Sequence, residues 1–420
     1  LTKRPAHGFL PRLYLLSALF ALIALPGFTQ IDSLKKVAAP GAPDTVRIQA
    51  LTDLCYTFLT INPDSSVFFG EQAVALADKI DFEKGSAASR SDLGLAYFYK
   101  GDLSRAISLW EAASVLREKL DDKSGVASLN IKIGAAYFKL GHYEKSLASQ
   151  MKALKMFEAL RFDNGTAQAM NNVAAVFEMQ KQFGKAREYY WKAWALNIKN
   201  NDTTQAGTVL INIGNIHYRE NSFDSAAWYW RKALAWIPEG SSPHYESIAY
   251  NNLAEIYTLN KSYDSAFLLI NKAIALRKLT KDYQGLTSSM NNLGRIYALQ
   301  KKYALAGKTY GAALDSARGK NLKIEESKIH LNLYSLYEET GDFKKALNSY
   351  VYYATLEDSL SNERSRKNLN ELLVTYETDK KEQQIAIQNA ELSSQKILIG
   401  RTYMIIGGLV VIVGLLIIIF

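Results

Sequence analysis

The chain has 420 residues, with 50 Lys and Arg against 41 Asp and Glu, so its formal net charge at neutral pH is +9. This modest positive excess is spread along the chain, which argues against a nucleic-acid-binding protein. The single cysteine, Cys55, excludes a fold held by an internal disulfide, so packed apolar side chains must stabilise the fold.

The N-terminal segment is typical of an export signal. Three cations precede an apolar run over residues 13–25, and Pro26 and Gly27 follow it. Charged, apolar and small-residue parts in this order predict a secretory signal peptide over residues 1–30. An uncleaved signal anchor is the alternative, although the apolar run is short for a membrane span.

A forty-residue period dominates the middle of the chain. An aliphatic residue followed, in all but the last copy, by a small one recurs at Leu93-Gly94, Ile133-Gly134, Val173-Ala174, Ile213-Gly214, Leu253-Ala254, Leu293-Gly294 and Leu333-Tyr334. Three residues later stand Tyr97, Tyr137, Phe177, His217, Tyr257, Tyr297 and Tyr337. A small residue lets two helices approach closely and the aromatic residue fills the wedge between them, so each unit is predicted to be a helix pair. Such pairs bury their apolar faces only by stacking on one another.

The pattern resembles the tetratricopeptide repeat. The first complete copy carries it at Leu93, Gly94, Tyr97, Ala106, Trp110 and Ala113. Seven such repeats cover residues 87–360, and the forty-residue length resembles the variant of kinesin light chains. Residues 44–86 resemble a degenerate repeat that caps the array. The resemblance implies an all-α fold, a right-handed superhelical solenoid whose concave side is lined by the first helix of each pair.

Two further segments follow the array. Residues 361–401 lack Pro and are rich in Lys, Glu and Gln, which predicts one long connector helix. Its heptad spacing fits either a marginal coiled coil or a solvated single spacer helix. Residues 402–420 carry no charge and are long enough to span a bilayer, and Gly400, Gly407 and Gly414 would let two such helices approach closely. Because the chain starts with Leu and stops at this apolar segment, we expect the natural protein to continue beyond it.

No catalytic, metal-binding or cofactor-binding constellation is present, so no enzyme is expected within these residues. The histidines have no spacing that would ligate a metal, and His217 occupies the wedge position of a Tyr. The tryptophans fall mostly at packing positions of second helices and are predicted to be core residues. They are Trp110, Trp191, Trp194, Trp228, Trp230 and Trp236.

A polar stripe on the first helices is the candidate binding site. Five successive repeats place an asparagine directly before the aliphatic residue, at Asn172, Asn212, Asn252, Asn292 and Asn332. Other polar residues of the stripe are Lys132, Lys139, Asn215, Arg219 and Arg295. An amide offers a donor and an acceptor together, which suits the backbone of an extended peptide.

In the peptide-binding proteins that this sequence resembles, asparagines at that place hold the ligand backbone, although Asp92 and Lys132 depart from the pattern. The alternative is that each asparagine bonds the neighbouring unit and helps to set the superhelix. The cations of the stripe favour an anionic partner, and Asp92, Glu255 and Glu339 offset them.

The order of segments resembles the outer half of membrane histidine kinases of Bacteroidetes-type bacteria. This resemblance implies a periplasmic sensor region in the bacterial inner membrane, with a single span at 402–420 and a homodimer formed through the connector and that span. A kinase domain would follow the last residue, since none is present in the chain. The alternative is a membrane-tethered scaffold that binds proteins in its groove without a signalling output.

Overall fold

A computed structural model of the chain describes residues 26–59, 61–361, 388 and 399–400. Within these residues the secondary structure is α-helical, apart from turns and an isolated bridge between Pro40 and Ala42. Contacts divide the chain into two compact units, Leu1–Leu276 and Arg277–Phe420. The predicted all-α helical repeat solenoid is confirmed, while its right-handed twist stays a prediction.

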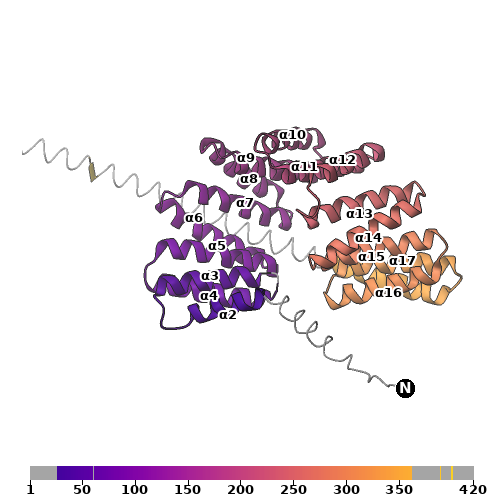
Figure 1. The fold of residues 1–420 in the computed structure, drawn as a ribbon, viewed down its shortest axis with the longest axis horizontal. Coiled ribbons are helices and arrows are strands. Elements are labelled where there is room, and N and C mark those ends of the chain that lie inside the picture. The colour runs from indigo at the N-terminus through magenta and orange to yellow at the C-terminus, as the bar shows by residue number, and fades with distance from the viewer. Residues whose placement is uncertain (1–25, 60, 362–387, 389–398, 401–420) are drawn as a thin grey trace, which may run out of the picture. The chain divides into compact units, whose positions relative to one another are not determined.

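The helices follow one another in antiparallel pairs, as Figure 1 shows for each unit. The helices that lie in the first unit are α2 (Pro26–Ala38), α3 (Asp44–Phe58), α4 (Pro63–Lys79), α5 (Glu83–Lys100), α6 (Leu103–Lys119), α7 (Lys123–Leu140), α8 (Tyr143–Ala159), α9 (Asp163–Met179), α10 (Phe183–Lys199), α11 (Thr203–Arg219), α12 (Phe223–Trp236) and α13 (Pro243–Leu259). Helix α14 (Tyr263–Leu279) contains the boundary between the units. The second unit continues with α15 (Tyr283–Leu299), α16 (Tyr303–Gly319), α17 (Lys323–Glu339) and a helical segment over residues 343–361.

A tight turn reverses the chain about every twenty residues. The residues with positive φ recur at this interval, and they are Asp81, Gly101, Asp121, Gly141, Arg161, Lys181, Asn201, Asn221, Lys261, Lys281, Lys301, Asn321 and Gly341. At the second of these non-glycine turns, the N–H of Asp122 donates to the carbonyl of Arg117 at 2.9 Å and closes the end of α6. Asp122 also caps α7, because its side chain accepts from the N–H of Gly125. Between residues 81 and 341 the pattern breaks at the early end of α12 at Trp236, after which Gly240 takes the positive φ.

In the repeats of Gly94, Gly134, Gly214 and Gly294, a large side chain of the second helix lies on the small residue of its own first helix. A Cβ added at Gly94 would lie 2.5 Å from Nε1 of Trp110, and one added at Gly214 would lie 2.6 Å from Nε1 of Trp230. The close approach lets the Trp110 indole donate to the carbonyl of Ser91 at 2.9 Å. Trp230 donates in the same way to the carbonyl of Ile211, at 3.1 Å. The same two positions carry Gly134 with Gln150, Ala174 with Tyr190, Ala254 with Ile270 and Gly294 with Tyr310.

First helices of neighbouring repeats contact one another inside each unit. In the first unit α3 contacts α5, α7 contacts α9, and α9 contacts α11, and in the second unit α15 contacts α17. Within the units, second helices pack between their own first helix and the next one, as α6 does between α5 and α7. The polar stripe of the first helices therefore faces the side on which neighbouring repeats meet.

Several predicted segments fall outside the described residues. These are most of the signal peptide (1–25), nearly all of the connector (361–401) and the membrane span (402–420). The predicted end of the signal peptide at residue 30 lies inside α2, and α5 begins at Glu83, inside the segment assigned to the cap. Among the described helices, none combines the length and apolar character needed to cross a bilayer.

The tryptophan prediction is confirmed for two residues and wrong for two others. Trp110 and Trp230 are buried in the core, whereas Trp191 and Trp228 are exposed on the second helices α10 and α12. Trp191 contacts the ring of Tyr229 with a centroid distance of 6.2 Å, and Trp228 contacts the same ring at 4.8 Å. Trp191 and Trp228 do not occupy the repeat position of Trp110, so their side chains project away from the first helix.

We expect Gly214→Ala to lower the free energy of unfolding by about 2 kcal/mol, because the added Cβ overlaps the Trp230 ring. Combined with Trp230→Ile, the same change should cost less, since the register already accommodates Ala254 with Ile270. A double-mutant cycle by urea unfolding should give a favourable coupling of at least about 1 kcal/mol. Gly311→Ala is the control, because nothing lies within 4 Å of its added Cβ, and additive effects at 214 and 230 would contradict the prediction.

Candidate functional site

The predicted asparagines bond side chains of the preceding repeat. The amide nitrogen of Asn172 donates to Oε1 of Gln150 at 3.3 Å, and that of Asn212 donates to Oδ1 of Asn171 at 3.1 Å. In the second unit Asn332 donates to Oδ1 of Asn291 at 2.9 Å. These bonds match the alternative in which asparagines tie neighbouring repeats together. Each bond uses one donor of the amide, so it leaves binding capacity on the stripe.

Three predicted residues of the first unit line one pocket. Asn215, Arg219 and Asn252 surround a cavity of about 360 Å³ together with Tyr218, Trp230, Asn251 and Glu255. The residues come from α11, α12 and α13, so neighbouring repeats form its two sides. Asn252 donates to Oδ1 of Asn215 at 3.1 Å across this cavity. This bond uses Nδ2 of Asn252 and Oδ1 of Asn215. Within the described part of the chain, the other two amide atoms, Nδ2 of Asn215 and Oδ1 of Asn252, take part in no hydrogen bond.

Arg219 lines the pocket and also forms an ion pair with a buried acid, Glu178. Its Nε lies 3.2 Å from Oε1 of Glu178, and the other carboxylate oxygen, Oε2, accepts from the hydroxyl of Tyr190 at 3.0 Å. Burial raises the pKa of Glu178, and the Tyr190 hydrogen bond and the Arg219 charge oppose that shift. Burial also raises the pKa of Tyr190 strongly. Because Glu178 offsets the positive charge of Arg219, the pocket attracts anions less than the sequence indicated.

The two predicted lysines lie in partly apolar surroundings. Lys132 donates to Oγ of Ser91 at 2.9 Å, and burial lowers its pKa while the Asp92 charge raises it. In the partner Asp92, burial raises the pKa, and the Lys132 charge opposes this shift. The Nζ of Lys139 stands 4.3 Å from the ring centroid of Phe98, and burial lowers its pKa. Both cations are therefore held by contacts with the preceding repeat.

The remaining predicted residues belong to the second unit. Asn292 and Arg295 lie on α15 and Asn332 lies on α17. The structure therefore brings Asn215, Arg219 and Asn252 together, while Asn332 is paired with Asn291 in a different unit.

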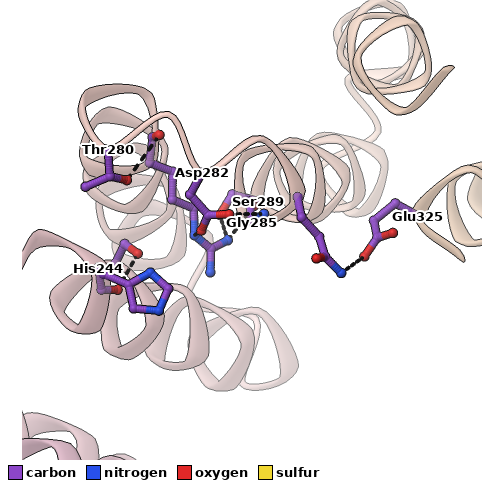
Figure 2. A network of polar contacts seen from close by, with 9 residues as sticks. His244, Thr280, Asp282, Gly285, Ser289 and Glu325 are labelled. Atoms are coloured by element: carbon purple, nitrogen blue, oxygen red, sulfur yellow. Dashed lines mark hydrogen bonds and ion pairs between the residues drawn. The ribbon is translucent and has the colours of Figure 1, made fainter. Parts of the chain in front are cut away.

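A second polar cluster supports the junction between α14 and α15. The Nη1 atom of Arg277 lies 2.5 Å from the Gly285 carbonyl and 2.5 Å from Oγ of Ser289. Figure 2 shows Asp282, Gly285 and Ser289 grouped at this junction, and Asp282 lies 3.8 Å from Nε of Arg277. Burial lowers the pKa of Arg277, which the Asp282 charge raises. Arg117 and Asp122 form the same kind of Arg–Asp ion pair in the first unit, so this pair is a recurring structural contact of the repeats.

Sequence reasoning missed the acceptors of these bonds. Asn171 and Asn291 lie one residue before the asparagines of the stripe, in a column that interior repeats otherwise fill with Ser91, Ile131, Ile211 and Asn251. Glu178 stands in a column that carries Phe98, Phe138 and Tyr218 in three repeats and Thr258, Ala298 and Glu338 in the other three. Because this column is variable and contains a second acid, no clear sequence signal marked Glu178.

The described residues hold no group of three histidines, cysteines or acids that could bind a metal ion. Cys55 is fully buried, and burial raises its pKa to about 11, which makes it a poor nucleophile at neutral pH. His217 stacks on Tyr229 with a centroid distance of 5.1 Å, in the wedge position that the sequence indicated.

Comparison with known proteins places the fold. Residues 125–199, which cover α7 to α10, match the tetratricopeptide repeat family. The quorum sensor NprR from B. thuringiensis, in its apo form, is similar with a TM-score of 0.55 and 13% identity over 78% of this chain and 98% of its own. Aspartyl phosphate phosphatase F from Bacillus subtilis has a TM-score of 0.55 and 16% identity over 79% and 94%. The Rap conjugation gene regulator of plasmid pLS20 has a TM-score of 0.56 and 15% identity over 80% and 94%. No curated protein matches the sequence.

We expect the protein to lose stability as the pH falls below about 6.5, in part through His330. This residue is 4% exposed and lies 3.3 Å from Arg318, and burial, followed by the Arg318 charge, lowers its pKa against the opposing effect of Glu326. The unfolded chain therefore takes up a proton that the folded chain rejects. Urea unfolding between pH 5 and 7.5 should show a smaller slope in His330→Gln, by at most about 1.4 kcal/mol per pH unit. An unchanged slope would contradict the assignment, and His217, whose pKa burial also lowers, accounts for part of the remainder.

Proposed function

We propose that this chain is the ligand-binding sensor region of a signalling protein of the bacterial inner membrane. In this proposal the repeats lie in the periplasm, the first helices bind a peptide or protein segment, and the chain itself performs no catalysis. The output is the kinase domain of a sensor histidine kinase beyond residue 420. The segment order of the sequence supports the membrane and signalling parts of this proposal.

The pocket between α11 and α13 supports the proposal that the chain binds a peptide. Nδ2 of Asn215 is a donor and Oδ1 of Asn252 is an acceptor, and they stand on adjacent repeats joined by a 3.1 Å hydrogen bond. A peptide bond offers the complementary acceptor and donor, so one residue of an extended ligand can bond both amides. Trp230 and Tyr218 line the same cavity and provide apolar contact for a side chain.

Two similar folds support a peptide as the ligand class. The Rap conjugation gene regulator of plasmid pLS20 was solved in complex with the Phr* peptide. A Rap protein was solved with the Competence and Sporulation Factor, and its TM-score is 0.51 at 14% identity. These proteins share the helical repeat fold with this chain, and the ligand class is carried over here as part of the proposal.

In the proposal, signal transmission uses the way in which the repeats stack. A ligand that bridges two first helices changes the angle between them, because it bonds residues of both repeats. Small changes of this kind add along a solenoid and alter the position of its last helix. In the proposal, this movement shifts the spacing of paired connector helices over residues 361–401.

We expect Asn215→Ala and Asn252→Ala each to weaken binding of a peptide about tenfold, since each removes one backbone hydrogen bond. The probe is a dodecapeptide selected by the protein from a random phage-displayed library, and isothermal titration calorimetry measures its affinity. Asn271→Ala is the matched control, because this amide lies on the second helix α14 and bonds the Phe267 carbonyl.

The same variants separate the two roles of the asparagines. Unchanged affinity together with a lower free energy of unfolding would mean that Asn215 and Asn252 only brace the repeats. Failure of the library to yield any peptide that competes at this pocket would contradict a peptide-binding groove.

We expect single cysteines introduced between Leu369 and Gly414 to form dimer cross-links in membranes with a seven-residue periodicity. A ligand selected as above should change which positions react, because the connector is proposed to shift. Absence of cross-links at every position would remove the signalling version. Reading the coding sequence past Phe420 provides an independent check, since a stop codon after a few basic residues would favour the scaffold.

A further inference from the structure

The first helices from α5 to α13 share one exposed position. It lies two residues after the wedge position and is occupied, in chain order, by Tyr99, Lys139, Met179, Arg219 and Leu259. These residues, which we call the exposed row, belong to five successive repeats of the first unit. Apolar and basic side chains alternate along the exposed row, so it offers a ligand two kinds of contact in a fixed order.

Contacts between side chains join the exposed row across neighbouring repeats. Nζ of Lys139 stands 4.3 Å from the ring centroid of Phe98, the residue before Tyr99. Nη2 of Arg219 lies 3.9 Å from Sδ of Met179. Helix α7 contacts α9, and a hydrogen bond between pocket residues joins α11 to α13. The exposed row therefore crosses adjacent first helices and reaches the pocket, which Arg219 lines.

Lys139 is the cation of the exposed row whose charge no acid offsets. Nε of Arg219 lies 3.2 Å from Glu178. Lys132, which precedes Lys139 on α7, has the opposing charge of Asp92 beside it. Within the described residues Lys139 forms no ion pair, and burial lowers its pKa without an opposing charge. A ligand carboxylate placed here would pair with a charge that the described part of the chain leaves unpaired.

Small side chains leave room for a ligand backbone beside the exposed row. Ala135 and Ala175 stand four residues before Lys139 and Met179, and both are partly exposed. Asn215 takes the same position on α11 and lines the pocket. A backbone that bonds Asn215 can therefore continue across α9 and α7, one helical turn away from the exposed row.

The distance between neighbouring helices determines which ligand residues face the exposed row. Packed helices lie about 8–10 Å apart. A peptide in the polyproline II conformation has about three residues per turn and rises about 3.1 Å per residue, so one turn covers about 9 Å. Every third side chain of such a ligand therefore meets the exposed row once per repeat. Because this conformation has no internal hydrogen bonds, its backbone N–H and C=O groups can bond the amides of the pocket.

We propose that the groove ligand is an acidic peptide in the polyproline II conformation, with a side-chain carboxylate at Lys139. Apolar side chains about three residues before and after the acid contact Tyr99 and Met179, which are 54% and 38% exposed. The residue bonded by the pocket amides lies about six positions from the acid, because α7 and α11 are two repeats apart. The inference rests on the proposed function, since it takes the pocket as the place where the peptide backbone binds.

Dodecapeptides selected by the protein from the random library test the acid and its spacing. They should carry Asp or Glu with an apolar residue three positions away. In calorimetry, changing this acid to Asn or Gln should weaken binding about fivefold. The same change should have no effect on binding to Lys139→Gln, because that variant already lacks the ion pair. An equal loss with the wild-type chain and with Lys139→Gln would overturn the proposal.

Lys185→Gln is the matched control for this cycle. Nζ of this exposed lysine also stands over an aromatic ring, 5.3 Å from the centroid of Phe177, but Lys185 lies on the second helix α10. Binding to Lys185→Gln should therefore keep the full loss when the peptide acid is neutralised.

A charge exchange tests the same pair from both sides. Lys139→Glu should weaken binding more than Lys139→Gln does, and a peptide with Lys in place of its acid should recover most of that affinity. Amidation of the peptide C-terminus should change the affinity little. A loss equal to that from neutralising the acid would place the terminal carboxylate at Lys139 and overturn the assignment to a side chain.

The spacing within the selected peptides tests the ligand conformation. A helix rises about 1.5 Å per residue, so a helical ligand would present side chains to successive repeats at intervals of about six or seven residues. Selected peptides in which the acid and the nearest apolar residue of the pattern have that spacing would overturn the polyproline II ligand.

Failure of this inference can be distinguished from failure of the proposed function. Peptides that lose affinity with Asn215→Ala or Asn252→Ala but are indifferent to Lys139→Gln would refute the acidic ligand and leave a peptide-binding groove. Peptides that are indifferent to the asparagine variants would contradict both.

Discussion

The contact between the first and second helices of one repeat determines the architecture. A glycine or alanine in the first helix leaves room for a large side chain of the second helix, and the indole N–H of Trp110 or Trp230 then bonds a carbonyl of the first helix. The distance between the two helices is set by this contact, because a Cβ at Gly94 or Gly214 would overlap the ring. Equal helices separated by turns at twenty-residue intervals repeat the contact along the chain.

The same constraint explains where the array ends. Tyr334 stands at the position of the small residue, so Tyr350 has no interior place and lies at the surface. The replacement converts a repeat-stacking helix into one with an open apolar face. At the last repeat this substitution therefore leaves a large aromatic side chain exposed.

The polar residues along the first helices have two roles, since some join neighbouring repeats and others are available for binding. Asn212 and Asn332 bond asparagines of the preceding repeat, and Arg219 is held by Glu178, so much of the polarity along the first helices joins repeats to one another. The pocket at Asn215 and Asn252 differs, because the amide pair still offers a donor and an acceptor there. Binding capacity is therefore localised, although the asparagines themselves are periodic.

The sequence alone determined the helical repeat, its forty-residue period and the core positions, because close helix packing demands small, aromatic and aliphatic residues at fixed intervals. It also placed Asn215, Arg219 and Asn252 on one stripe. Only the tertiary structure decided that Glu178 offsets the charge of Arg219, that Trp191 and Trp228 are exposed, and that Tyr334 contacts the ring of Tyr350. These features depend on which residues of adjacent repeats are in contact. A periodic sequence pattern predicts the structure of each repeat, but it does not show which side chains of the neighbouring repeat lie against it.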